Sequence, residues 1–131
     1  MAAYKGFWRE QVKAYAKADI KGTSLKKYAT LDALSRVEID VERMKGAGTV
    51  SRGEPTHDAK VTALGLDKKI PDADLTDCLD ISKWQTVKRA SGEVVPFPKS
   101  QPARYITSVS AEKWGKQWLI TKVTPNGDRS C

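Results

Sequence analysis

The chain has 131 residues, of which 40% are hydrophobic and 30% charged, and its formal net charge is +7. This length and composition predict one globular domain over residues 1–131, and they exclude a disordered chain and a transmembrane helix. The charge alone would suggest nucleic-acid binding. Basic and acidic residues are, however, mixed in both parts of the chain, with ten basic and six acidic residues up to residue 50 and thirteen and ten after it. Such mixing is typical of a solvated surface, so we expect no nucleic-acid partner.

Residues 4–18 repeat large apolar side chains at helical spacing. Tyr4, Trp8, Val12 and Tyr15 recur at intervals of three or four, and lysine and arginine occupy a neighbouring stripe. This pattern predicts an amphipathic helix with an aromatic inner face.

The next segment predicts a short turn and a second helix. Ser24 is suited to cap a turn that runs through Tyr28, and Thr30 or Asp32 is suited to cap a longer helix. The apolar stripe of that helix continues to Met44. Gly46 and Gly48 follow it, as glycine does at helix ends, so the predicted helical region spans about residues 4–46.

From Ala59 to Val123 the apolar period changes to two, which predicts strands. The expected strands cover residues 57–67, 73–81, 84–90, 94–95, 104–112 and 117–124, with a phase change near residue 63 that indicates a β-bulge. The proline-rich residues 96–102 cannot lie in a central strand. Residues 113–116 form a predicted hairpin tip, and Trp114 on it is expected to be exposed.

Two helices followed by a run of antiparallel strands predict an α+β domain. We expect the N-terminal helices to pack on one strongly curved, mostly antiparallel sheet over residues 57–124. Such an arrangement is expected to enclose a pocket between the helices and the sheet.

Two cysteines, Cys78 and Cys131, leave two interpretations open. They are 53 positions apart with no third thiol, and the only histidine, His57, is far from both in sequence, so a metal site is not expected. The two thiols are either unrelated and buried, or joined in a disulfide that would hold the last residue and place the protein outside the reducing cytosol.

Three stretches of sequence resemble one family. They are Thr76-Asp77-Cys78-Leu79-Asp80, Trp114-Gly115-Lys116-Gln117-Trp118-Leu119-Ile120 and Gly127-Asp128-Arg129-Ser130-Cys131. Together with the order of elements, they resemble actinobacterial secreted proteins and lipoproteins of the nuclear transport factor two-like (SnoaL-like) superfamily. The resemblance covers nearly the whole chain.

This resemblance implies a cone-shaped, cystatin-like sheet wrapped round a helix, with a cavity between them. It also implies a disulfide between Cys78 and Cys131, and export with a signal or lipid-attachment segment that this chain lacks. Members of the superfamily include enzymes and non-catalytic binding domains, so the fold does not decide the function.

Asp77 is the most interesting candidate site residue because it falls between Leu75 and Leu79 on the apolar side of its strand. If that side lines the cavity, a desolvated carboxyl group there would suit acid–base chemistry. The alternative is a structural role, in which Asp77 pairs with an arginine or lysine or accepts backbone hydrogen bonds. His57 could in principle pair with Asp77, but it follows Pro55-Thr56 at a strand entrance and is expected to be a surface histidine.

Tyr15, Tyr28 and Tyr105 are candidates to direct hydroxyl groups into the pocket, although aromatic residues at these spacings are often plain core. We therefore expect a non-catalytic extracytoplasmic domain that binds a small apolar ligand or a protein, with no cofactor. A homodimer and an association with the cell envelope are left open. Two alternatives are an isomerase or cyclase that uses Asp77, and an electrostatic binder of anionic polymers.

Overall fold

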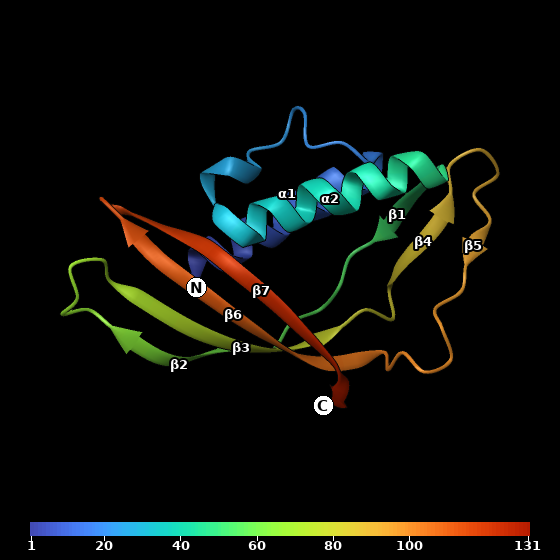
Figure 1. The fold of residues 1–131 in the computed structure, drawn as a ribbon. Helices are drawn as coiled ribbons and strands as arrows, with labels where there is room; N and C mark the ends of the chain where they lie inside the picture. Colours follow the sequence, from blue (N-terminus) through green and yellow to red (C-terminus); the bar gives the residue numbers. More distant parts are fainter.

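The computed structural model describes residues 1–131. The chain begins with two helices that cover one face of an antiparallel sheet (Figure 1). Helix α1 covers Ala2–Lys17, a 3₁₀ turn η1 covers Leu25–Lys27, and helix α2 covers Leu31–Ala47. Ser24 and Thr30 occupy the predicted N-cap positions, and Gly48 ends α2 in a left-handed conformation. The helical predictions are confirmed.

Seven strands follow the helices. They are β1 (Thr49–Gly53), β2 (Ala59–Gly65), β3 (Asp72–Asp80), β4 (Trp84–Lys88), β5 (Val94–Val95), β6 (Arg104–Trp114) and β7 (Gln117–Ser130). All strand pairs are antiparallel, in a three-stranded sheet of order β1-β4-β5 and a four-stranded sheet of order β2-β3-β6-β7. The predicted α+β class, with N-terminal helices on a curved sheet, is confirmed.

The two sheets are joined by one long, bent hairpin. The pairing of Gly53 with Trp84 at the end of β1 and β4 continues through the bridge between Thr56 and Asp80 into the pairing of Ala59 with Asp77. The register is therefore almost continuous across the break between the sheets. Because the hairpin bends at this break, the strands curve up towards the ends of the helices (Figure 1).

Gly53 stands at the bend and requires the absence of a side chain. Its φ is +84°, and a Cβ atom placed on it would lie 2.0 Å from the backbone oxygen of Lys83. Only glycine adopts this conformation without strain. Because Gly53 has no side chain, its backbone and that of Lys83 approach closely where the two strands of the hairpin bend.

The main core lies between the helices and the concave face of the four-stranded sheet. It includes the aromatic face of α1, the apolar stripe of α2, and alternate residues of β3, β6 and β7; its most deeply buried large side chains are Phe7, Leu25 and Ile120. The predicted inner face of β3 is confirmed, because Leu75, Leu79 and Ile81 are all buried. Trp114 is exposed at the hairpin tip, as expected.

The predicted limits of the sheet, residues 57–124, are wrong at both ends. The structure also has two sheets where one was predicted. Strand β1 was not expected because only two of its five residues are buried, which gives no alternation. At the other end β7 runs through Pro125-Asn126-Gly127, which is typical of a turn. Proline is tolerated there because β7 is an edge strand and needs no further hydrogen-bond donor.

Candidate functional site

Asp77 lies on the concave face of the sheet beneath α1. In the register of the four-stranded sheet it stands directly between Ala59 of β2 and Thr107 of β6, and residues opposite each other share a face. Its relative exposure is 0%. A carboxylate in such a place must be compensated by hydrogen bonds or charge, since an isolated buried charge is strongly unfavourable.

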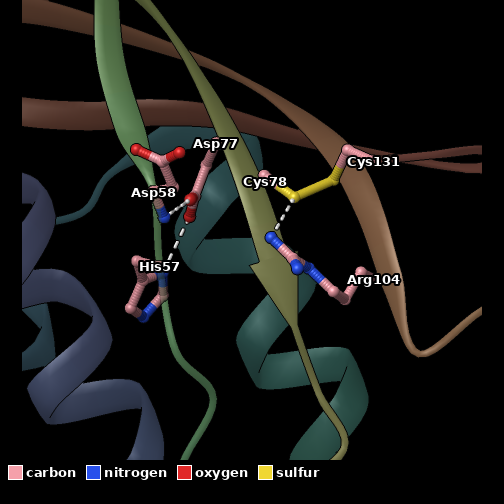
Figure 2. The surroundings of a disulfide bond; sticks show 6 residues. All are labelled: His57, Asp58, Asp77, Cys78, Arg104 and Cys131. Atoms are coloured by element: carbon pink, nitrogen blue, oxygen red, sulfur yellow. Dashed lines mark hydrogen bonds and ion pairs between the residues drawn. A yellow bond between two sulfur atoms is a disulfide. The ribbon is translucent and has the colours of Figure 1, made fainter.

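Three donors supply this compensation. The Tyr4 hydroxyl donates to Oδ2 of Asp77 at 2.6 Å, Nδ1 of His57 lies 2.7 Å from the same oxygen, and the backbone N–H of Asp58 donates to Oδ1 at 2.9 Å. Figure 2 shows His57 and Asp58 reaching Asp77 from the strand entrance before β2. The network therefore ties α1, β3 and the connection between β1 and β2 together.

The electrostatics of the network keep the carboxyl group ionised at neutral pH. Burial acts to raise the pKa of Asp77, but the hydrogen bonds from His57, Tyr4 and the Asp58 backbone outweigh it and hold the pKa below its ordinary value. Burial and the contact with Asp77 raise the pKa of the Tyr4 hydroxyl far above its ordinary value. An ionised Asp77 accepts the Nδ1–H of His57, which leaves Nε2 as the nitrogen that faces away from the carboxylate.

An open groove of about 650 Å³ lies on the His57 side of this network. Tyr4, Trp8 and His57 form its aromatic part, and the side chain of His57 is 29% exposed. The Trp8 ring centroid is 5.0 Å from that of His57. The charged residues of the groove are Lys5, Arg9, Lys13 and Glu54.

A second space, a chamber of about 190 Å³, lies on the Thr107 side of Asp77, between both helices and the sheet. Its lining includes Gln11 and Tyr15 of α1, Trp84 of β4, and Tyr105 and Thr107 of β6. Trp84 stacks on Tyr15 with ring centroids 5.2 Å apart, so these two lining rings cover each other's facing sides. Trp8 lines both spaces and therefore lies between the groove and the chamber.

Four buried polar atoms among the chamber residues have no hydrogen-bond partner. They are Nε1 of Trp8, Oε1 of Gln11, Nε1 of Trp84 and Oγ1 of Thr107. Gln11 is 8% exposed and Thr107 only 1%. Buried polar groups are nearly always satisfied in folded proteins, and these four atoms are enclosed by neighbouring protein atoms, with almost no surface open to the chamber.

The predicted site residues fall in three places. Tyr15 and Tyr105 line the chamber. Tyr28 lies on the outer side of α1 and lines neither the groove nor the chamber; its ring covers Gly6, and its hydroxyl accepts a hydrogen bond from Arg9. Asp77 also lines neither space, because its carboxylate is enclosed by its three donors.

The sequence indicated the partners of Asp77 only in part. The backbone hydrogen bond from Asp58 agrees with the structural alternative. His57 lies at the surface, as expected, and its ring nitrogen also pairs with Asp77. Tyr4 was assigned only to the apolar stripe of α1. A buried tyrosine hydroxyl needs a partner, but all four tyrosines share this property, so it does not single out Tyr4.

The polar residues of the chamber carried a clearer signal that was not used. Gln11 interrupts the buried face of α1 between Phe7 and Tyr15, at intervals of four. Thr107 similarly stands between Tyr105 and Val109 in the alternating pattern of β6. A polar residue on an apolar face indicates either a buried partner or a ligand.

The disulfide between Cys78 and Cys131 is present, as the family resemblance implied, with Cα atoms 6.0 Å apart. It lies on the opposite face of β3 from Asp77, and Arg104 donates to the Cys78 sulfur at 3.5 Å (Figure 2). A closed loop of this length stabilises the folded chain by roughly 4 kcal/mol in the chain-entropy model.

Neither of two other features that would point to a function is present. No group of three histidine, cysteine, aspartate or glutamate side chains is arranged to hold a metal ion. No helix combines the length and the apolar character needed to cross a bilayer.

Comparison with known proteins shows the fold alone. No protein-family model and no curated protein matches the sequence. Among solved structures, the chain is similar to the intermembrane space region of the chloroplast protein ARC6, with 12% sequence identity and a TM-score of 0.57. The match covers 99% of this chain and 93% of the other. The fold and the site together define an α+β protein with a partly open cavity between its helices and its sheet.

Proposed function

We propose that this chain is a non-catalytic, extracytoplasmic domain of the nuclear transport factor two-like type that binds one small planar molecule in the chamber. The observation that carries the proposal is the cavity of about 190 Å³ between the helices and the sheet, whose lining is mainly apolar and aromatic.

The energetics favour an occupied chamber. Apolar surface removed from water contributes about 25 cal/mol per Å² to binding, and the chamber lining includes the apolar side chains of Phe7, Leu79 and Val123.

Two observations support the extracytoplasmic location. Disulfides persist in oxidising compartments and are rare in the reducing cytosol, and the chain has a disulfide between Cys78 and Cys131. The similar solved structure is described as an intermembrane space region.

The four tryptophan indole N–H groups provide the test. In ¹H–¹⁵N correlation spectra, titration with small neutral aromatics (indole and phenol) is expected to shift the Trp84 indole signal and to leave that of the exposed Trp114 unchanged. Saturating probe that moves no chamber signal would contradict the proposal.

The Asp77–His57 pair favours a second candidate, an enzyme of the isomerase or cyclase kind. Because Asp77 lines neither space, it would act as a positioning residue, and Nε2 of His57 would be the base that faces the groove. The base would remove a proton next to a carbonyl group, and the resulting enolate would be reprotonated at another position.

Deuterium exchange tests this candidate. An enzyme of this kind is expected to exchange the α-protons of the ketone 2-tetralone into D₂O faster than buffer does, and the variant His57→Gln is expected to lose the excess rate. Exchange at the buffer rate would exclude this candidate while leaving the chamber proposal intact. Binding of anionic polymers is not proposed, since Glu10 already pairs with Arg9 and Lys13 in the groove wall.

A further inference from the structure

The tips of two hairpins lie side by side at one end of the four-stranded sheet (Figure 1). The first tip is residues 66–71, between β2 and β3, and the second is residues 113–116, at the turn between β6 and β7. The backbone N–H of Lys113 donates to the carbonyl oxygen of Pro71 at 2.8 Å, which joins the two tips directly. We call these residues the paired tips.

The paired tips expose three large apolar side chains. Leu66 is 59% exposed, Ile70 52% and Trp114 43%. The apolar surface continues along β2, the edge strand of the sheet, where Leu64 and Val61 are also exposed. Exposed apolar residues of a soluble domain are usually scattered, and a contiguous apolar patch with a polar rim marks a surface that binds a protein or a membrane.

Lysine is the main charged residue of the paired tips. The tips contain one acid and four lysines, which are Asp67, Lys68, Lys69, Lys113 and Lys116, so their formal charge is +3. Lys68 pairs with Asp72 at 2.8 Å, and the other three lysines form no ion pair. Glu112, which adjoins the second tip, accepts a hydrogen bond from Nε1 of Trp114 at 2.9 Å. Three cations therefore flank the exposed apolar side chains without a partner.

A further basic segment adjoins the second tip. Gln117, which directly follows this tip, donates from its side chain to the backbone carbonyl oxygen of Lys27 in η1. Lys26 and Lys27 are both exposed. The positive surface therefore extends from the paired tips to the short turn between the helices.

We infer that the paired tips dock on an anionic lipid bilayer, with the three apolar side chains in the headgroup region and the lysines against the lipid phosphates. The inference goes beyond the chamber function and does not depend on it. Apolar side chains flanked by lysines bind charged membrane surfaces, and tryptophan favours the boundary between lipid and water. Lipids can close around short projecting tips, whereas a protein partner of ordinary affinity needs about 800 Å² of surface on each side.

Cosedimentation with vesicles tests the inference. Vesicles of phosphatidylcholine with about one third phosphatidylglycerol are expected to bind the protein about tenfold more tightly than vesicles of phosphatidylcholine alone. The double variant Lys113→Gln/Lys116→Gln is expected to lose most of this preference, and Trp114→Ser is expected to weaken binding to the anionic vesicles about tenfold. Brominated lipid is expected to quench tryptophan fluorescence, and Trp114→Phe is expected to keep the binding and lose this quenching.

Control variants carry the same changes at exposed residues outside the paired tips. Lys83→Gln/Lys99→Gln is the control for charge and Ile39→Ser the control for apolar exposure, and both are expected to bind the anionic vesicles as the natural protein does. Absence of binding to the anionic vesicles, or equal losses in tip and control variants, would overturn the inference. Binding of soluble polyglutamate in place of vesicles would also overturn it and would assign the surface to an acidic protein.

Discussion

Replacement of Asp77 by asparagine tests the role of the buried network in stability. The carboxylate accepts three hydrogen bonds at 2.6–2.9 Å and has no exposure to solvent. Hydrogen bonds to a charged group contribute about 1.5–3 kcal/mol and neutral ones about 0.5–1.5 kcal/mol, so three weakened bonds cost about 3 kcal/mol. Relief of the burial of the charge returns about 1 kcal/mol, so we expect Asp77→Asn to lower the free energy of unfolding by about 2 kcal/mol at pH 7.

The pH dependence of this difference has a definite sign. Asp77 has a pKa below its ordinary value in the folded state, so its stabilising contribution is present at neutral pH, above the pKa of the unfolded chain. As the pH falls below about 4, the unfolded chain takes up a proton first, and the contribution is lost as the pH approaches the lower folded-state pKa. The difference between the natural protein and Asp77→Asn is therefore expected to stay constant from pH 7 to about pH 5 and to narrow as the pH falls further towards the folded-state pKa.

Urea unfolding followed by tryptophan fluorescence, with the disulfide intact, measures this difference at each pH. Asp67→Asn is the matched control, since Asp67 is exposed and its carboxylate accepts no hydrogen bond; its effect is expected to be within about 0.5 kcal/mol. A stability of Asp77→Asn equal to that of the natural protein at pH 7, or a difference that stays constant as the pH falls below about 5, would refute the electrostatic account.

Three further predictions concern the disulfide, the chamber and the bend. Reduction of the disulfide is expected to lower the free energy of unfolding by roughly 4 kcal/mol, as measured by urea unfolding, and mass spectrometry with and without reductant should differ by two hydrogens. Thr107→Val removes a buried hydroxyl without a partner and is expected to raise the free energy of unfolding by about 1 kcal/mol. Thr121→Val removes a hydrogen bond to a backbone carbonyl and is expected to lower the free energy of unfolding by about 1 kcal/mol. The opposite order would contradict the unpartnered state of Thr107. Gly53→Ala is expected to destabilise the fold by about 3 kcal/mol, because it combines a left-handed φ with a backbone clash. Gly92→Ala has open space at a φ of +74° and is expected to destabilise the fold by about 1 kcal/mol. Equal thermal midpoints of the two variants would argue against the close approach at the bend.

Much of the fold could be predicted from local patterns. The aromatic stripe of α1 and the glycine after α2 gave the helices, and the change of period gave most strands, including the bulge between Val61 and Ala63. Strand β1 could not be predicted, because a short strand with two buried residues has no readable period. The extension of β7 through Pro125 was missed because local turn propensity was overridden by pairing with β6.

The candidate site was predicted only in part. Alternation placed Asp77 on the buried face of β3 between Leu75 and Leu79, and this is where it lies. Tyr15 and Tyr105 do line a chamber, whereas Tyr28 packs outside it. No local pattern distinguishes these tyrosines, because each lies at a regular helical or strand spacing, and the direction of its hydroxyl depends on elements far away in the chain.

By itself, the sequence determined the type and order of the elements and the face on which Asp77 lies, because periodic burial within a segment depends only on neighbouring residues. The tertiary structure alone decided that Tyr4, 73 positions away, and His57, 20 positions away, would share that carboxylate. It also decided that Gln11, Trp84 and Thr107 would surround one chamber. Such meetings depend on how the helices cross the sheet and where the hairpin bends, and these angles are set by the packing of the whole core.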